Sequence, residues 1–112
     1  MKLSENKSQI WFKVLTIDGS DLDNEMKKWP LPEGNKKTEW LTSNSAIGTC
    51  IVNNPKIFMQ RNNRAFVVEL SGQEPAVEFP GIAWVHKLRL IREATNLDLK
   101  RFNIHRAIQQ RV

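Results

Sequence analysis

The chain contains a single cysteine, Cys50, and no tyrosine among its 112 residues. One cysteine cannot form an internal disulfide, which favours a reducing, intracellular setting. No apolar run approaches the roughly 18 residues that cross a bilayer. The polar start, MKLSENKSQI, lacks the apolar stretch of a signal peptide. These absences predict a cytoplasmic protein that does not bind a membrane.

The chain also lacks the short motifs that carry common chemistry. It has no glycine-rich phosphate loop, no Cys-x-x-Cys, no His-Glu-x-x-His and no Gly-x-Ser-x-Gly. The acidic segment DGSDLD lacks the residue order and the distal glutamate of a calcium loop. A turn followed by a helix cap explains its carboxylates. We therefore expect no metal site, no cofactor and no catalytic residues.

A small enzyme of transferase or nuclease type is the alternative class. Its acid or base would be His86 or His105, the only histidines, and its nucleophile would be Cys50, because such groups need only meet in space. The segment around Cys50 is typical of a buried strand, where a thiol acts as a small hydrophobic group. The sequence therefore favours a protein that is not an enzyme.

Composition and length predict one domain. Hydrophobic residues make up 40% of the chain and charged residues 26%, which is ordinary for a globular domain. No repeat or linker divides the chain, and its length suffices for one hydrophobic core. We predict a single domain over residues 1–112, in which residues 1–8 are flexible.

Several segments are rich in β-branched or aromatic residues and end at turn residues, which predicts strands. The clearest is IWFKVLTI, residues 10–17, which ends at DGSD. A hairpin is predicted over residues 56–70, with its turn at Asn62-Asn63. Residues 71–81 are predicted to form a loop or a broken edge strand, because their prolines cannot donate ladder hydrogen bonds. Further strands are predicted at residues 35–43 and 46–52.

Residues 84–92, WVHKLRLIR, fit two kinds of element. A strand would place Trp84, His86, Leu88 and Leu90 on one face. A helix would align Trp84, Leu88 and Ile91 instead. We favour the strand.

Two helices complete the predicted fold. Leu22, Met26 and Trp29 recur at helical spacing after a possible Ser20–Asp23 capping box, which predicts a short helix near residues 21–29. Asn96 or Asp98 caps a second helix near residues 97–110, whose apolar side includes Leu97 and Ile104. The predicted class is α+β: a compact, mainly antiparallel sheet of about five strands with a short N-terminal helix and a C-terminal helix.

The positive charge is concentrated in the last quarter of the chain. Residues 85–112 hold seven Lys or Arg against two acids, which accounts for the whole net charge of +5. Such asymmetry is typical of a protein that binds a polyanion or an acidic partner. The alternative is a solvated face with extended arginines. The candidate binding residues here are Arg89, Arg92, Lys100, Arg101, Arg106 and Arg111.

Four tryptophans extend the candidate surface. Trp11 and Trp84 lie in apolar surroundings that indicate core positions. Trp29 and Trp40 flank the polar segment PLPEGNKKTE, and exposed rings there would stack on bases or anchor a protein partner. The alternative is that both rings close the core beneath this loop.

The segment WPLPEGNKKTEWLTSNSAIGTC resembles a diffuse class of small bacterial and phage domains of unknown function. The shared features are Trp-x-Leu-Pro, a glycine, a second tryptophan and a cysteine, followed by a basic strand and a C-terminal helix. Where that class shows Gly-aromatic-His after the cysteine, this chain reads IVNNPKIF, so an activity that depends on that histidine is not implied. A shorter stretch, LIREATNLDLKRF, is similar to the C-terminal domain of the ribosomal stalk protein and would imply helix at residues 88–95.

Charge and resemblance together predict a small, basic, non-catalytic binding module. Its partner is an acidic protein or a nucleic acid, and the residues leave this choice open. The resemblance and the small size imply one particular form: a phage or mobile-element protein that inhibits a host factor in the host cytoplasm. The oligomeric state is not predicted.

Overall fold

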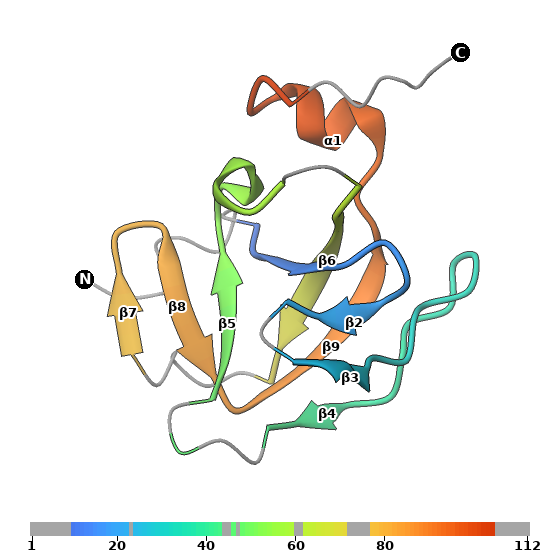
Figure 1. Ribbon diagram of the computed structural model, residues 1–112, viewed down its shortest axis with the longest axis vertical. Coiled ribbons are helices and arrows are strands. Elements are labelled where there is room, and N and C mark those ends of the chain that lie inside the picture. Colours follow the sequence, from blue (N-terminus) through green and yellow to red (C-terminus); the bar gives the residue numbers. More distant parts are fainter. Residues whose placement is uncertain are drawn as a thin grey trace.

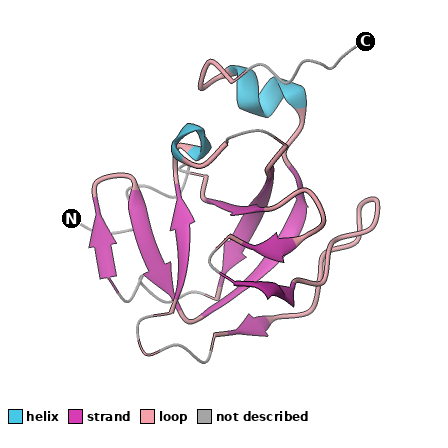
Figure 2. Ribbon diagram, viewed as in Figure 1, coloured by secondary structure: helices cyan, strands magenta, loops and turns pink. Residues whose placement is uncertain are grey.

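The computed structural model describes residues 10–22, 24–43, 46, 48–59, 62–71 and 77–104. Strands dominate this part of the chain, and its helical structure is limited to one short α-helix and one 3-10 turn (Figure 2). In chain order the elements are β1 (Phe12–Leu15), β2 (Ser20–Asp21), β3 (Asn24–Lys28), β4 (Leu41–Thr42), β5 (Thr49–Val52), η2 (Pro55–Ile57), β6 (Arg64–Leu70), β7 (Val77–Phe79), β8 (Ile82–Val85), β9 (Lys87–Glu93) and α1 (Asn96–Lys100).

The nine strands form one antiparallel sheet (Figure 1). Seven of them follow the order β4-β9-β6-β1-β5-β8-β7, and β2 joins β1 to β3. The central strand is β1, since one of its edges pairs with β6 while the other pairs with β5 at Phe12 and with β2 at Leu15. The short edge strand β7 confirms the predicted edge strand within residues 71–81.

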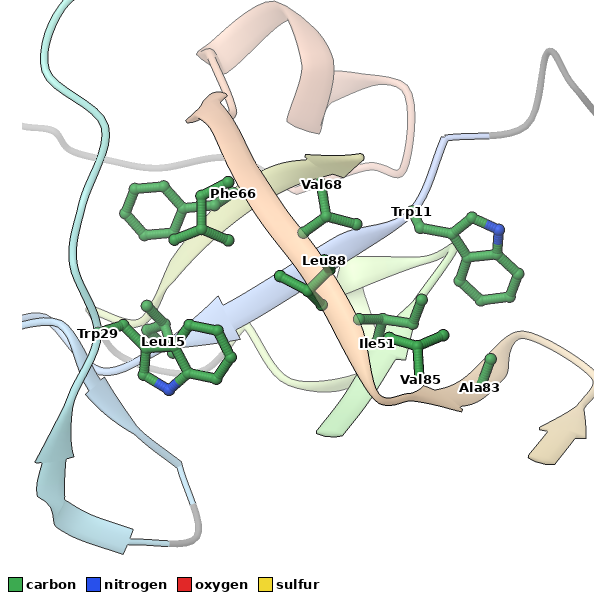
Figure 3. Close-up of a cluster of buried hydrophobic side chains, with 10 residues drawn as sticks. Trp11, Leu15, Trp29, Ile51, Phe66, Val68, Ala83, Val85 and Leu88 are labelled. Carbon is green, nitrogen blue, oxygen red and sulfur yellow. The ribbon is translucent and has the colours of Figure 1, made fainter. Parts of the chain in front are cut away.

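The sheet curls around an interior hydrophobic cluster (Figure 3). Strands from both halves of the sheet, β9 and β6 on one side of β1 and β5 and β8 on the other, contribute side chains to it, so the sheet encloses the cluster rather than lying flat on one side of it. Trp29, directly after β3, also points into the cluster (Figure 3). The buried members are Trp11, Leu15, Trp29, Ile51, Phe66, Val68, Ala83, Val85, Leu88 and Leu90.

The opposite face of β1 carries a second cluster, which α1 covers. Phe12 and Val14 point to this face, because successive residues of a strand face opposite ways. Leu99 of α1 is fully buried against it. Phe102 packs edge to face on Phe12, with ring centroids 5.8 Å apart. Both faces of β1 are buried, Lys13 included, and the strand predicted at residues 10–17 is confirmed at Phe12–Leu15.

The predicted α+β class is wrong. The sheet has nine strands rather than about five, and α-helix in the described part of the chain is limited to the five residues of α1. The short helix predicted near residues 21–29 is the hairpin of β2 and β3. The domain is therefore mainly antiparallel sheet.

The helical spacing in residues 21–29 does not mark one buried face. Trp29 is 8% exposed, whereas Met26 is 88% exposed. A short isolated helix is marginal in water, while pairing with β1 gives the backbone of β2 its hydrogen bonds. Ser20, the predicted helix cap, is buried in β2 and donates a hydrogen bond to Asp18 at 2.9 Å. Its predicted partner Asp23 lies outside the described residues.

The predicted C-terminal helix is shorter and differently capped. Thr95, rather than Asn96 or Asp98, is the N-cap, and Asp98 completes the capping box. After α1 ends at Lys100, Asn103 adopts a left-handed backbone conformation with φ 62°, and the N–H of Ile104 donates to the carbonyl of Leu99 at 3.2 Å. This is a common way for a helix to terminate. The rest of the prediction, from residue 105 onward, lies outside the described residues.

The hairpin predicted over residues 56–70 is also wrong. Pro55 begins the 3-10 turn η2, which the Asn54 side chain caps, so among the described residues of this range only β6 is a strand. The strand preferred at residues 84–92 is confirmed, with a bend at His86 that separates β8 from β9. The strands predicted at residues 35–43 and 46–52 are confirmed only at Leu41–Thr42 and Thr49–Val52.

Within the described residues, no helix has the length and apolar character needed to cross a membrane.

Candidate binding surface around Trp40

Trp40 is the most exposed tryptophan among the described residues. It precedes β4, whose residues Leu41 and Thr42 lie opposite Leu88 and Lys87 of β9. Leu88 is buried in the core, so its neighbours Lys87 and Arg89 point to the outer face of β9. The guanidinium carbon of Arg89 lies 4.5 Å from the centroid of the Trp40 ring, and the ammonium of Lys87 lies 5.9 Å from it.

A carboxylate on the next strand holds Arg89 in this position. Glu69 of β6 lies directly opposite Arg89 and accepts a hydrogen bond from its Nε at 2.9 Å. Lys37 Nζ reaches the same carboxylate at 3.2 Å. The hydrogen bond from Arg89, followed by that from Lys37, lowers the pKa of Glu69. We call the group of Lys37, Trp40, Glu69, Lys87 and Arg89 the Trp40 surface.

The Trp40 surface carries three cations against one carboxylate, so it is positive. The indole of Trp40 is 36% exposed, which leaves apolar area at the centre of this charge. Tryptophan and arginine are the side chains that most often anchor protein interfaces. Its chemistry therefore suits an acidic partner that also offers an apolar contact.

Three other predicted basic residues lie away from the Trp40 surface. Arg92, near the end of β9, pairs with Asp98 of α1 at 2.6 Å. Lys100 and Arg101 are exposed at the end of α1. Figure 1 shows α1 at the top of the molecule and β4 at the bottom, so the basic segment is divided between two ends of the domain. The predicted residues Arg106 and Arg111 lie outside the described residues.

Arg101 borders a separate hollow beside α1. The hollow has a volume of about 390 Å³ and lies over Phe12 and Phe102. Asn53 and Asn54 form part of its polar rim. The hollow therefore brings Arg101, a predicted binding residue, close to two asparagines that were not among the predicted binding residues.

Trp29, also predicted as a binding residue, is a core residue. Its Nε1 donates to Asp21 at 3.2 Å, and the ammonium groups of Lys13 and Lys27 each lie 5.2 Å from its ring centroid. Lys13 is only 5% exposed and donates to Thr49 Oγ1 at 2.9 Å. The sequence feature that could have predicted this buried network is Lys13, a lysine among the apolar residues of β1.

The candidate catalytic residues occupy different environments. Cys50 lies on β5, half-buried, beside a small hollow of about 60 Å³ that Leu22 and Phe58 also line. His86 is exposed at the bend between β8 and β9, with Nε2 3.1 Å from the carbonyl oxygen of Ala46. His105 lies outside the described residues. Within the described part, no three His, Cys, Asp or Glu side chains gather to hold a metal ion.

Comparisons with protein-family models, with curated proteins and with solved structures gave no match.

Proposed function

We propose that this protein is a non-catalytic binding module that holds an acidic protein partner on the Trp40 surface. The observation that carries the proposal is the position of Trp40, a partly exposed indole over which Arg89 and Lys87 lie at 4.5 and 5.9 Å. An aromatic ring framed by arginine is a common centre of a protein interface. The surrounding positive charge speeds the encounter with an acidic partner and selects against basic ones.

The arrangement of charges favours a protein over a nucleic acid. Two of the predicted phosphate-binding residues, Arg89 and Arg92, already pair with Glu69 and Asp98 of the same chain. Phosphate binding depends on the number of cations that neutralise phosphates. Because two of these cations already have carboxylate partners, a protein that adds an apolar contact at Trp40 is favoured over a ligand bound through phosphates alone. The ring of Trp40 already carries two cations of its own chain, whereas base stacking needs an open ring face.

Fluorescence anisotropy with three labelled probes tests the proposal. The probes are polyglutamate, single-stranded DNA and single-stranded RNA, each titrated at several salt concentrations. We expect polyglutamate to bind best and binding to weaken as salt rises, because the contact is ionic. A clear preference for DNA or RNA would overturn the acidic-protein assignment.

Variants locate the binding surface. Lys87→Glu reverses one charge of the Trp40 surface, and Trp40→Ala removes its anchor. Each is expected to weaken polyglutamate binding by about tenfold, the size of effect typical of an interface anchor. The matched control is Lys56→Glu, the same charge change at the exposed η2 turn, which should leave binding nearly unchanged. Equal loss in the control would place the binding elsewhere on the surface.

A further inference from the structure

The curled sheet closes incompletely between β3 and β4. Six strands, in the order β3-β2-β1-β6-β9-β4, form a continuous hydrogen-bonded run. Its two end strands lie next to one another (Figure 1) and border the same hollow. In the described part of the chain, β3 pairs only with β2, and β4 pairs only with β9. We call this opening the seam; its lining residues are Lys27, Lys28, Trp29, Pro30, Leu41, Thr42, Ser43 and Thr49.

On the β4 side, the backbone of Thr42 faces the seam. The N–H of Ser43 donates to the carbonyl of His86 at 2.8 Å, so it points towards the β9 side. Along an antiparallel pair, successive residues direct their backbone groups to opposite edges. The N–H and C=O of Thr42, which lies opposite Lys87, therefore point away from β9.

On the β3 side, the same alternation directs the backbone of Lys28 into the seam. The N–H of Trp29 donates to the carbonyl of Gly19 at 3.0 Å, towards the β2 side. Lys28 precedes Trp29 and lies opposite Ser20, so its N–H and C=O point to the other edge. Two strand edges with outward-facing backbone groups thus face one opening, the geometry that an extended peptide uses when it adds to a sheet.

The hollow within the seam has a volume of about 110 Å³. Its apolar lining comes from Trp29, Pro30 and Leu41. An apolar cavity of roughly 150 Å³ holds a benzene molecule, so this hollow suits one aliphatic side chain. It therefore provides a pocket for one apolar residue of an extended segment.

The charge of the seam indicates the chemistry of its occupant. Lys27 and Lys28 line it, and no carboxylate among the described residues does. Lys28 pairs with Asp18 at 2.8 Å, but both side chains are about 60% exposed, which makes this a weak surface pair. Acidic side chains on an incoming segment would therefore meet two lysines.

We infer that the seam binds an extended acidic peptide segment as an added strand. The backbone of the segment pairs with Thr42 and Lys28, one aliphatic side chain enters the hollow, and its carboxylates lie beside Lys27 and Lys28. This inference rests on the proposed function, since it specifies how the acidic protein partner is held. Trp40 lies two residues before Thr42, so one partner can contact both the Trp40 surface and the seam.

Amide-resolved NMR with a synthetic peptide tests the inference. The probe is a blocked peptide of alternating glutamate and valine, titrated into ¹⁵N-labelled protein. We expect the largest shifts at the backbone amides of Thr42 and Lys28. A Lys-Val peptide of the same length should not bind.

Two N-methylated Glu-Val peptides test the backbone pairing. One is methylated at the glutamate nitrogens and the other at the valine nitrogens, so each removes the N–H groups that face one edge of the added strand. At least one of them should bind about tenfold more weakly, because strand addition depends on main-chain hydrogen bonds.

Variants separate the inference from the proposed function. Lys27→Glu should weaken the Glu-Val peptide more than it weakens polyglutamate, while Lys56→Glu should affect neither. The inference is overturned if the Glu-Val peptide does not bind, or if both N-methylated peptides bind as well as their parent. Binding that is lost in Trp40→Ala but insensitive to N-methylation would overturn the seam and leave the Trp40 surface in place. If polyglutamate binds no better than DNA or RNA, the result counts against the proposed function rather than against the seam.

Discussion

Asp98 of α1 accepts a hydrogen bond from Arg92 of β9 at 2.6 Å and a second at 3.4 Å. The same carboxylate accepts the backbone N–H of Thr95 at 2.8 Å. One side chain therefore closes the first turn of α1 and ties the helix to the end of β9. Charge-assisted bonds of this kind are among the stronger hydrogen bonds in proteins.

Replacing this carboxylate should destabilise the domain in a pH-dependent way. Arg92, aided by Thr95, holds the pKa of Asp98 at about 2, below its ordinary 3.8. Because the folded-state pKa is the lower one, the stabilisation is complete above pH about 4 and is lost as the pH falls towards 2. Asp98→Asn should lower the free energy of unfolding by about 1–2 kcal/mol at pH 7.

Urea unfolding between pH 2 and pH 7 measures this effect. The difference between Asp98→Asn and the parent chain should shrink in the most acidic samples. Glu39→Gln, the same type of change at an exposed site, serves as the control and should follow the parent chain. A constant difference across the whole range would contradict the assigned pKa.

Removing the carboxylate of the Trp40 surface should strengthen acidic binding. Glu69 is the negative charge of that surface, and Arg89 and Lys37 hold its pKa low. Glu69→Gln frees two cations and should tighten polyglutamate binding by about threefold, mostly through faster association. Stopped-flow anisotropy checks the rate. Glu33→Gln makes the same charge change at another exposed site, and an equal gain there would show only an effect of net charge.

The contribution of Lys13, the buried lysine of β1, to stability should depend on its partner Asp21. Lys13 Nζ lies 3.7 Å from Asp21, and the two side chains are only 6% and 13% exposed. Lys13→Met removes one charge and leaves the other buried, which should cost about 3 kcal/mol, whereas Lys13→Met with Asp21→Asn should cost clearly less. Chemical denaturation of both variants decides this. A double variant that is less stable than Lys13→Met would show that the pair is not coupled in this way.

Gly48 should not tolerate a side chain. It adopts φ 96°, and an added Cβ would lie 2.5 Å from the carbonyl oxygen of Val85. Gly48→Ala should lower the free energy of unfolding by at least about 2 kcal/mol, since the clash involves backbone that must move. Gly34→Ala separates the two causes, because Gly34 has φ 61° with nothing within 4 Å of the added Cβ. Thermal unfolding should show the smaller loss for Gly34→Ala, and equal losses would remove the clash from the explanation.

The sequence correctly predicts elements that are buried on both faces. Residues 12–15 are buried on both faces, so the apolar run alone indicates a strand. The helix predicted near residues 21–29 failed because three apolar residues happened to share helical spacing while long-range pairing with β1 decided the structure. Pairing partners distant in sequence are not visible in a local pattern, which is also why β2 and β3 were missed as strands.

The candidate site was predictable in composition but not in arrangement. The positive charge of β9 follows from the sequence, whereas the sequence left open whether Trp40 is exposed or buried; Arg89 does lie at Trp40. The carboxylate that orients Arg89 belongs to β6, twenty residues earlier, and nothing local signals it. Trp29 and Trp40 flank the same polar segment, yet Trp29 packs in the core cluster while Trp40 lies beside Arg89 on the outer face of the sheet.

The position of β1 has a consequence for how this chain acquires its structure. Phe12 lies beside Val52 on one edge and beside Val67 on the other, so, apart from the nearby β2, the central strand pairs with strands that follow it by tens of residues. Closing such long loops precedes any gain from pairing, and sheets with distant partners fold in milliseconds to seconds. We therefore expect slow, cooperative folding that cannot be completed until β6 has been synthesised, although the local pairing of β1, β2 and β3 can form earlier.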